Sequence, residues 1–215
     1  MKPELQRDLM AALERPHRLG TIGGDLEEQL AHCASFSSVL SQLHRSTGRG
    51  IDLGTGGGLP GVALAGSFPS MSWTLVDVRA ARAAEVERTV LRLGYQERVT
   101  VIAAEAQHVG HDPEYREGFD VVVARAFGPP SITAECAAAV VRVGGSFVIS
   151  EPPKNPHKED SGVRWSAAGL ALLGLTIPQF IVVDGYRFAI IEKTAPTPAR
   201  VPRLPARPSR GWLTS

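Results

Sequence analysis

The stretch that decides the fold of this 215-residue chain reads Asp52-Leu53-Gly54-Thr55-Gly56-Gly57-Gly58-Leu59-Pro60-Gly61. It begins within a short expected strand, Ile51-Asp52-Leu53, and Pro60 suits the first turn of a helix. Glycines between a strand and a helix let the backbone turn tightly and approach a ligand closely. The stretch therefore predicts a ligand-binding turn at the carboxyl end of a buried strand.

Two kinds of cofactor site use such a turn. A dinucleotide site has the spacing G-x-G-x-x-G, which Gly56, Gly58 and Gly61 satisfy. A methyltransferase site has an acidic residue at the strand end and then alternate glycines, as in Asp52, Gly54, Gly56 and Gly58. The carboxylate suits the cationic amino-acid group of S-adenosylmethionine and repels a pyrophosphate. None of the three tyrosines precedes a lysine by four residues, as a short-chain dehydrogenase requires. We therefore expect S-adenosylmethionine as the cofactor.

Short β-branched runs alternate with alanine-rich stretches from residue 50 onward, which indicates βαβ units around a parallel sheet. The expected strands are 51–53, 73–78, 99–103, 119–124 and 146–150, and the expected helices include 79–93 and 130–143. Two further apolar runs flank Asp184-Gly185, a pair typical of an antiparallel hairpin. These seven strands predict an α/β fold, the class I Rossmann-like methyltransferase with a mostly parallel sheet and a C-terminal antiparallel hairpin.

The chain is expected to have three parts. Residues 1–49 have helical stripes of leucine and predict a small helical segment that covers one edge of the sheet. Residues 50–194 form the methyltransferase domain. Residues 195–215 form a basic tail with five prolines and no acidic residue, which predicts an extended, solvated chain.

Composition limits the possible functions. Hydrophobic residues make up 43% and charged residues 21% of the chain, which is typical of a globular protein, and the net charge of +1 does not indicate nucleic acid by itself. The N-terminus has no apolar signal, and the most apolar stretch, 167–177, is too short to span a bilayer. Two distant cysteines suit a reduced compartment. We expect a cytoplasmic monomer that binds neither membrane nor metal, since His108 and His111 have no evident third ligand.

A second acidic residue, Asp77, ends the second expected strand. A carboxylate at this place can accept hydrogen bonds from both hydroxyls of a ribose. It can equally cap the helix that begins near Arg79. Both roles are compatible with each other.

With these residues in place, the chain resembles the RsmG (GidB) family of 16S ribosomal RNA guanine-N7 methyltransferases. The resemblance lies in the glycine stretch, in residues 74–77, 104–107 and 119–127, and in the basic segment 192–210. It implies S-adenosylmethionine contacts at Gly54, Leu59, Ala106, Gln107 and Arg125, with Arg125 as the candidate catalytic residue. It also implies 16S ribosomal RNA, or the small ribosomal subunit, as the partner.

The chain departs from the family after the fifth strand. The family has Ala-Leu-Lys-Gly there, whereas this chain has Ile149-Ser150-Glu151-Pro152-Pro153, so a carboxylate replaces the lysine expected near the substrate. The N-terminal part also lacks the Asn-Leu-Thr element of the family. The candidate substrate residues are Phe127, Glu151, Lys154, Arg200, Arg203 and Arg207. For Phe127, stacking on a base and packing in the core both remain open.

Guanine N7 has a free lone pair and no proton to lose, so its methylation requires positioning rather than a general base. After the fourth strand the chain has Arg125-Ala126-Phe127-Gly128 instead of the Asn/Asp-Pro-Pro-aromatic motif of enzymes that methylate exocyclic amines. Two alternatives stay open: a methyltransferase of another RNA or of a small molecule, and a non-catalytic S-adenosylmethionine-binding RNA or assembly factor.

Overall fold

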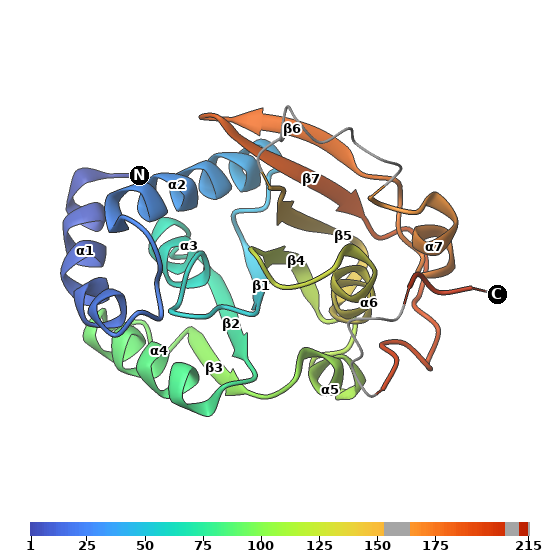
Figure 1. The fold of residues 1–215 in the computed structure, drawn as a ribbon, viewed down its shortest axis with the longest axis horizontal. Coiled ribbons are helices and arrows are strands. Elements are labelled where there is room, and N and C mark those ends of the chain that lie inside the picture. Colours follow the sequence, from blue (N-terminus) through green and yellow to red (C-terminus); the bar gives the residue numbers. More distant parts are fainter. Residues whose placement is uncertain (153–163, 205–210, 215) are drawn as a thin grey trace. The chain divides into compact units, whose positions relative to one another are not determined.

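The computed structural model describes residues 1–152, 164–204 and 211–214 (Figure 1). The chain divides into two compact units, Met1–Ala106 and Gln107–Ser215. Seven strands form the mixed sheet; they follow the order β3-β2-β1 in the first unit and β4-β5-β7-β6 in the second. The predicted α/β class with a seven-stranded, mostly parallel sheet is confirmed. Lys154 and Arg207 lie outside the described residues.

The first unit is a parallel three-stranded sheet with four helices. Its elements are α1 (Pro3–Arg18), α2 (Leu26–Gln42), β1 (Gly48–Leu53), α3 (Gly61–Ser67), β2 (Met71–Asp77), α4 (Ala80–Arg92) and β3 (Val99–Ala103). The strand β2 pairs in parallel with β1 on one side and β3 on the other. All seven residues of β2 except Ser72 are buried, which explains its nearly continuous apolar sequence.

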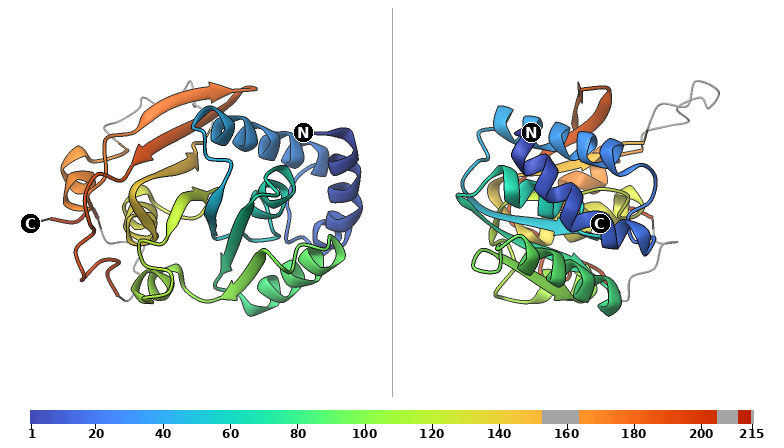
Figure 2. Two further views of the ribbon diagram at one scale, coloured as in Figure 1. Left: turned by 180° about the vertical axis from the view of Figure 1, so that it is seen from behind. Right: turned by 90° about the vertical axis from the view of Figure 1, so that its left-hand side faces the viewer.

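The N-terminal helices pack on other helices. The helix α1 contacts α3 and α4, and α2 contacts α3 (Figure 2). The leucine stripe of α1 explains this, since Leu9 and Leu13 are fully buried. Asp25 caps α2 by accepting a hydrogen bond from the Glu28 N–H at 2.9 Å. The helices α1 and α2 thus both pack on α3, and α1 also packs on α4, within their own unit.

The second unit carries the antiparallel part of the sheet. Its strands are β4 (Phe119–Ala124), β5 (Val141–Ser150), β6 (Gln179–Val183) and β7 (Tyr186–Glu192), and its helices are α6 (Pro130–Val140) and α7 (Ala167–Leu172). A short helix, α5 (Ala106–His111), begins at the boundary of the two units. The strand β5 is parallel to β4 and antiparallel to β7, which pairs antiparallel with β6. The predicted hairpin is confirmed, because Asp184 and Gly185 both have the positive φ of a type I′ turn.

Two expectations about the second unit are wrong. The helix predicted over 130–143 ends at Val140, because the β-branched Val141 and Val143 extend β5 and Val141 pairs with Phe119 of β4. The tail is solvated only in part over 195–204, since Val201 is fully buried and Thr197 is 7% exposed, whereas Arg200 is exposed. Polar contacts with other parts of the unit hold this segment down. Within the described residues, no helix has the length and apolar character needed to cross a membrane.

Candidate cofactor site

The glycine turn is hydrogen-bonded to the end of β2. The N–H groups of Gly54 and Thr55 both donate to the carbonyl of Val76 at 2.9 Å, and the Gly58 N–H donates to the Thr55 carbonyl at 2.9 Å. Gly54, Gly56 and Gly58 have φ values of 74°, 59° and 103°, a region that side chains disfavour. The alternate glycines are therefore required by the backbone of the turn itself.

Asp77 holds two backbone groups at once. Its Oδ2 accepts from the Gly56 N–H and its Oδ1 from the Arg79 N–H, both at 2.9 Å, and the residue is only 5% exposed. A carboxylate oxygen has two lone pairs, so each oxygen keeps one for a further donor. The contact with Arg79 supports the start of α4, and the remaining lone pairs suit ribose hydroxyls. The structure thus leaves both predicted roles of Asp77 available together.

Asp52 lies beneath the turn. It is fully buried, and its Oδ2 accepts from the Gly61 N–H at 2.9 Å. A Cβ added to Gly61 would lie 2.8 Å from this oxygen and 2.2 Å from Leu75 Cδ2. Gly61 is therefore needed for close packing, and Asp52 fixes the path of the chain into α3.

Several features of the turn fit S-adenosylmethionine. A Cβ at Gly57 would lie 2.4 Å from Ile22 Cγ1, whereas one at Gly56 would meet nothing nearer than 3.9 Å, so the open side of the turn is at Gly56. The buried Thr55 hydroxyl has no hydrogen-bond partner among the described residues. With the carboxylate of Asp77 beside Gly56, the turn offers open backbone and a carboxylate acceptor side by side.

The other expected cofactor residues lie in different surroundings. Leu59 and Ala106 are buried in the first unit, at 3% and 4% exposure. Gln107 is buried at the start of α5. Arg125 and Phe127, in the loop after β4, are both partly exposed, so Phe127 is not a fully buried core residue.

The substrate candidates in the described chain differ sharply from one another. Glu151, 6% exposed, accepts from Trp165 Nε1 at 3.1 Å and from Arg164 Nη1 at 2.9 Å. The carboxylate that replaces the family lysine is therefore a partner for nearby side chains. Arg203 is paired with Glu135, whereas Arg200 is exposed. The described residues contain no group of three or more side chains able to ligate a metal.

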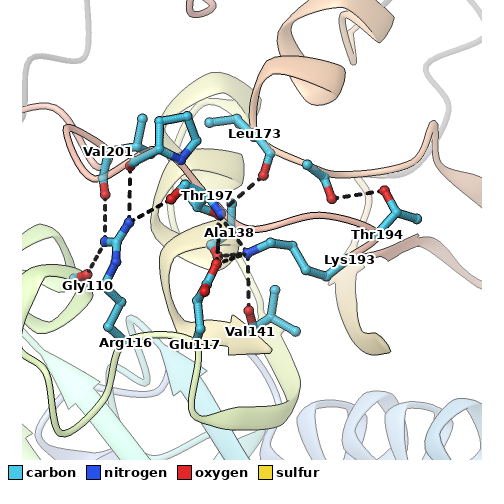
Figure 3. Close-up of polar contacts among 12 residues, drawn as sticks. Gly110, Arg116, Glu117, Ala138, Val141, Leu173, Lys193, Thr194, Thr197 and Val201 are labelled. Carbon is cyan, nitrogen blue, oxygen red and sulfur yellow. Dashed lines mark hydrogen bonds and ion pairs between the residues drawn. The ribbon is translucent and has the colours of Figure 1, made fainter. Parts of the chain in front are cut away.

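Sequence reasoning missed one polar cluster, formed around Lys193. Its Nζ is buried and donates to Glu117 Oε1 at 2.9 Å and to Thr197 Oγ1 at 2.6 Å (Figure 3). The two members Lys193 and Glu117 are 76 positions apart in the chain. A buried lysine has no sequence pattern of its own, and the only available signal was a lone lysine after the apolar strand β7.

Comparisons with known proteins show which family the chain resembles. Residues 22–159 match the family described as GidB, rRNA small subunit methyltransferase G. A "Ribosomal RNA small subunit methyltransferase G" from Roseiflexus castenholzii is 35% identical over 74% of this chain and 68% of its own length. Another protein of the same name, from Alkaliphilus metalliredigens, is 29% identical over 95% of this chain and 86% of its own length.

Solved structures share the fold at low sequence identity. The mitomycin 7-O-methyltransferase MmcR has a TM-score of 0.59 at 16% identity, over 77% of this chain and 54% of that one. The antibiotic-resistance methyltransferase Kmr has a TM-score of 0.52 at 19% identity, over 73% of this chain and 93% of that one. The family match and the curated relatives extend this likeness from fold to family: the chain belongs to the RsmG (GidB) family.

Proposed function

We propose that this chain is an S-adenosylmethionine-dependent methyltransferase that methylates N7 of a guanine in 16S ribosomal RNA. The observation that carries the proposal is the glycine turn joined to Asp77 in a chain of this family, since this pairing suits an adenosine cofactor. The name of these relatives, ribosomal RNA small subunit methyltransferase G, supports the small ribosomal subunit as the partner.

The cofactor supplies a methyl group on a sulfonium. In this proposal Gly54, Gly56 and Gly58 offer backbone to it, and Asp77 accepts its ribose hydroxyls with the free lone pairs. Asp52 acts from beneath the turn, by holding Gly61 and by placing negative charge near the amino-acid end. Three buried residues complete the proposed set: Leu59, Ala106 and Gln107.

The methyl transfer itself requires little chemistry from side chains. The acceptor nitrogen attacks with its own lone pair, so the chain contributes orientation and charge rather than a base. Arg125, partly exposed after β4, is the proposed orienting residue. Phe127 in the same loop is partly exposed, and it is the residue proposed to stack on the acceptor base.

Among the tail arginines of the described chain, Arg200 is the one we propose to contact RNA phosphates, because its side chain is exposed. Lys154 and Arg207 remain proposed cationic contacts from the sequence alone. Arg203 and Glu151 act on the substrate indirectly in this proposal, through their ion pairs with Glu135 and Arg164.

The test supplies labelled S-adenosylmethionine to the full-length protein with small subunits, large subunits or naked 16S RNA from cells lacking this methylation. The proposal predicts label in small-subunit RNA that exceeds label in large-subunit RNA. Label in another RNA or in a small molecule would support a diverged acceptor instead. Cofactor binding by calorimetry without transfer to any acceptor would support the non-catalytic alternative.

A further inference from the structure

The helix α6 begins directly after the loop that carries Arg125 and Phe127. Within its first turn, the Thr133 hydroxyl lies 2.9 Å from the Pro129 carbonyl and 3.2 Å from the Gly128 carbonyl. These contacts fasten the loop to the N-terminal end of α6. The place of the loop therefore depends on the place of the helix.

The C-terminal end of α6 is held by the tail and by the segment before β4 (Figure 3). Lys193 Nζ donates to the Ala138 carbonyl at 2.6 Å, and the Thr197 hydroxyl lies 2.9 Å from the same oxygen. The Glu117 N–H donates to the Ala139 carbonyl at 2.8 Å. The last carbonyls of a helix have no partner within it, so these groups cap α6.

The tail itself is pinned by two adjacent residues. Glu117 Oε1 accepts from the Thr197 N–H at 2.7 Å as well as from Lys193. Burial alone would raise the pKa of Glu117, but these two donors hold it below its usual range. The Arg116 guanidinium donates to the carbonyls of Val201 at 2.8 Å and Pro198 at 3.0 Å. The tail residues 197–201 are thereby fixed to the segment that precedes β4 in the same unit.

The middle of α6 is held by a separate ion pair. Glu135 is 4% exposed and accepts from the Arg203 N–H at 3.0 Å and from Arg203 Nε at 2.8 Å; Arg203 Nη2 contacts it too. A buried carboxylate is unsuited to binding phosphate, so Glu135 is not itself an RNA contact. The tail therefore holds α6 at its middle through Arg203 and at its end through Thr197.

We propose that Glu135 is a positioning residue for methyl transfer. Through Glu135, Arg203 and the tail hold α6, and α6 holds the loop of Arg125 and Phe127 in the geometry that the reaction requires. An α-helix of this length is a rigid rod of about 16 Å, so a shift at its middle moves its first turn. This proposal rests on the proposed function, because only that function gives the loop of Arg125 and Phe127 a substrate to act on.

The kinetic test compares E135Q, R203Q and the double variant with the wild type on small subunits. The matched control is R142Q, which removes the ion pair of Arg142 with Asp120 in the same unit. Each single variant should lower kcat roughly tenfold and leave RNA affinity within about twofold, because the loop is misplaced but the binding surface is kept. The double variant should be no slower than either single one, and R142Q should keep its kcat.

A different pattern would overturn the proposal. If Arg203 acts as a phosphate contact, R203Q weakens RNA binding, whereas E135Q frees the guanidinium and strengthens it. The conservative variant E135D keeps the charge and should recover part of the kcat that E135Q loses. If E135Q does not fold, R203K replaces it in the test. A lysine keeps the positive charge of Arg203 but cannot contact Glu135 through two nitrogens, so R203K should also lower kcat.

Hydrogen exchange gives a readout that needs no substrate. The backbone amides of residues 126–128 and 131–133 should exchange faster in E135Q than in wild type, measured where both are fully folded, and should be unchanged in R142Q. Equal exchange in E135Q and wild type would overturn the positioning role. If wild type methylates no acceptor, the proposed function fails, and this exchange experiment still decides whether Glu135 holds the loop.

Discussion

The Oδ2 atom of Asp77 accepts a hydrogen bond from the backbone N–H of Gly56 at 2.9 Å, which joins the end of β2 to the turn after β1. One carboxylate thus shapes the turn and keeps lone pairs for a ligand. Asp77→Asn should weaken S-adenosylmethionine binding by about 1–3 kcal/mol, because an amide nitrogen cannot accept. Isothermal calorimetry measures this directly.

The control for Asp77 is Asp112→Asn. Asp112 is exposed, and its Oδ1 accepts from the Glu114 N–H at 2.9 Å, the same two-residue turn that Asp77 makes with Arg79. This variant should bind the cofactor like wild type. Equal affinity in both variants would remove Asp77 from the site.

Gly58→Ala should abolish cofactor binding. The residue has a φ of 103°, and an added Cβ would lie 2.9 Å from Val62 Cγ2, so the turn must shift. Gly94→Ala is the matched control, since it has a φ of 72° at the end of α4 with nothing within 4 Å. Each variant should lose about 1–3 kcal/mol of stability through backbone strain, but only Gly58→Ala should lose affinity for the cofactor. Chemical denaturation and calorimetry together separate the two effects, and wild-type affinity in Gly58→Ala would contradict the proposed site.

The elements that sequence predicts well here are those with local signals. Strands such as β4 are nearly continuous apolar runs because both faces are largely covered. Asp184-Gly185 predicts its hairpin from the backbone angles that these residues tolerate. The glycine turn was also located from sequence. Its hydrogen bond to Asp77 was not, because spacing along the chain does not say which oxygen meets which N–H.

The parts that sequence could not predict depend on contacts between distant residues. The tail has five prolines and four arginines, which indicate a solvated chain by composition. It is instead held by Arg116, Glu117 and Glu135, which lie 68 to 85 positions away along the chain. The predicted end of α6, at residue 143, lies beyond the observed end at Val140 for a related reason, since pairing with β4 places Val141 in a strand.

Stability should depend on Glu85 at neutral pH. This carboxylate is buried on α4 and contacts Arg15 Nε of α1 at 2.6 Å and Arg88 Nη1 at 2.7 Å. Burial alone would raise the pKa of Glu85, but the two arginines outweigh it and hold the pKa below its ordinary value. Because the folded pKa is the lower one, the stabilisation is present above the unfolded pKa of about 4.3 and is lost as pH falls through the folded pKa.

Glu85→Gln should therefore lower the free energy of unfolding by about 1–2 kcal/mol at pH 7, a modest figure because both arginines are more than half exposed. The difference from wild type should shrink below about pH 4. Urea unfolding from pH 3 to pH 7 measures it, with the exposed Glu87→Gln as control. A difference that does not change with pH would contradict the ion-pair explanation.

The exposed Arg200 should contribute to RNA affinity through charge. Arg200→Gln should weaken small-subunit RNA binding most at low salt and lower the slope of log K against log salt by about 1. Binding titrations at several salt concentrations test this, with Arg142→Gln as control. Removing the whole tail is a poor test, because the buried Thr197 and Val201 would be lost with it. An unchanged salt slope would make Arg200 a bystander.

The most direct measurement of the central claim is the identity of the methylated nucleoside. Small subunits lacking 7-methylguanosine are incubated with the full-length protein and labelled S-adenosylmethionine, and the RNA is then digested and examined by mass spectrometry. We predict labelled 7-methylguanosine in the 16S RNA treated with the wild-type protein, and none in the 16S RNA treated with the Gly58→Ala variant. No labelled 7-methylguanosine, from protein that calorimetry shows to bind S-adenosylmethionine, would contradict it.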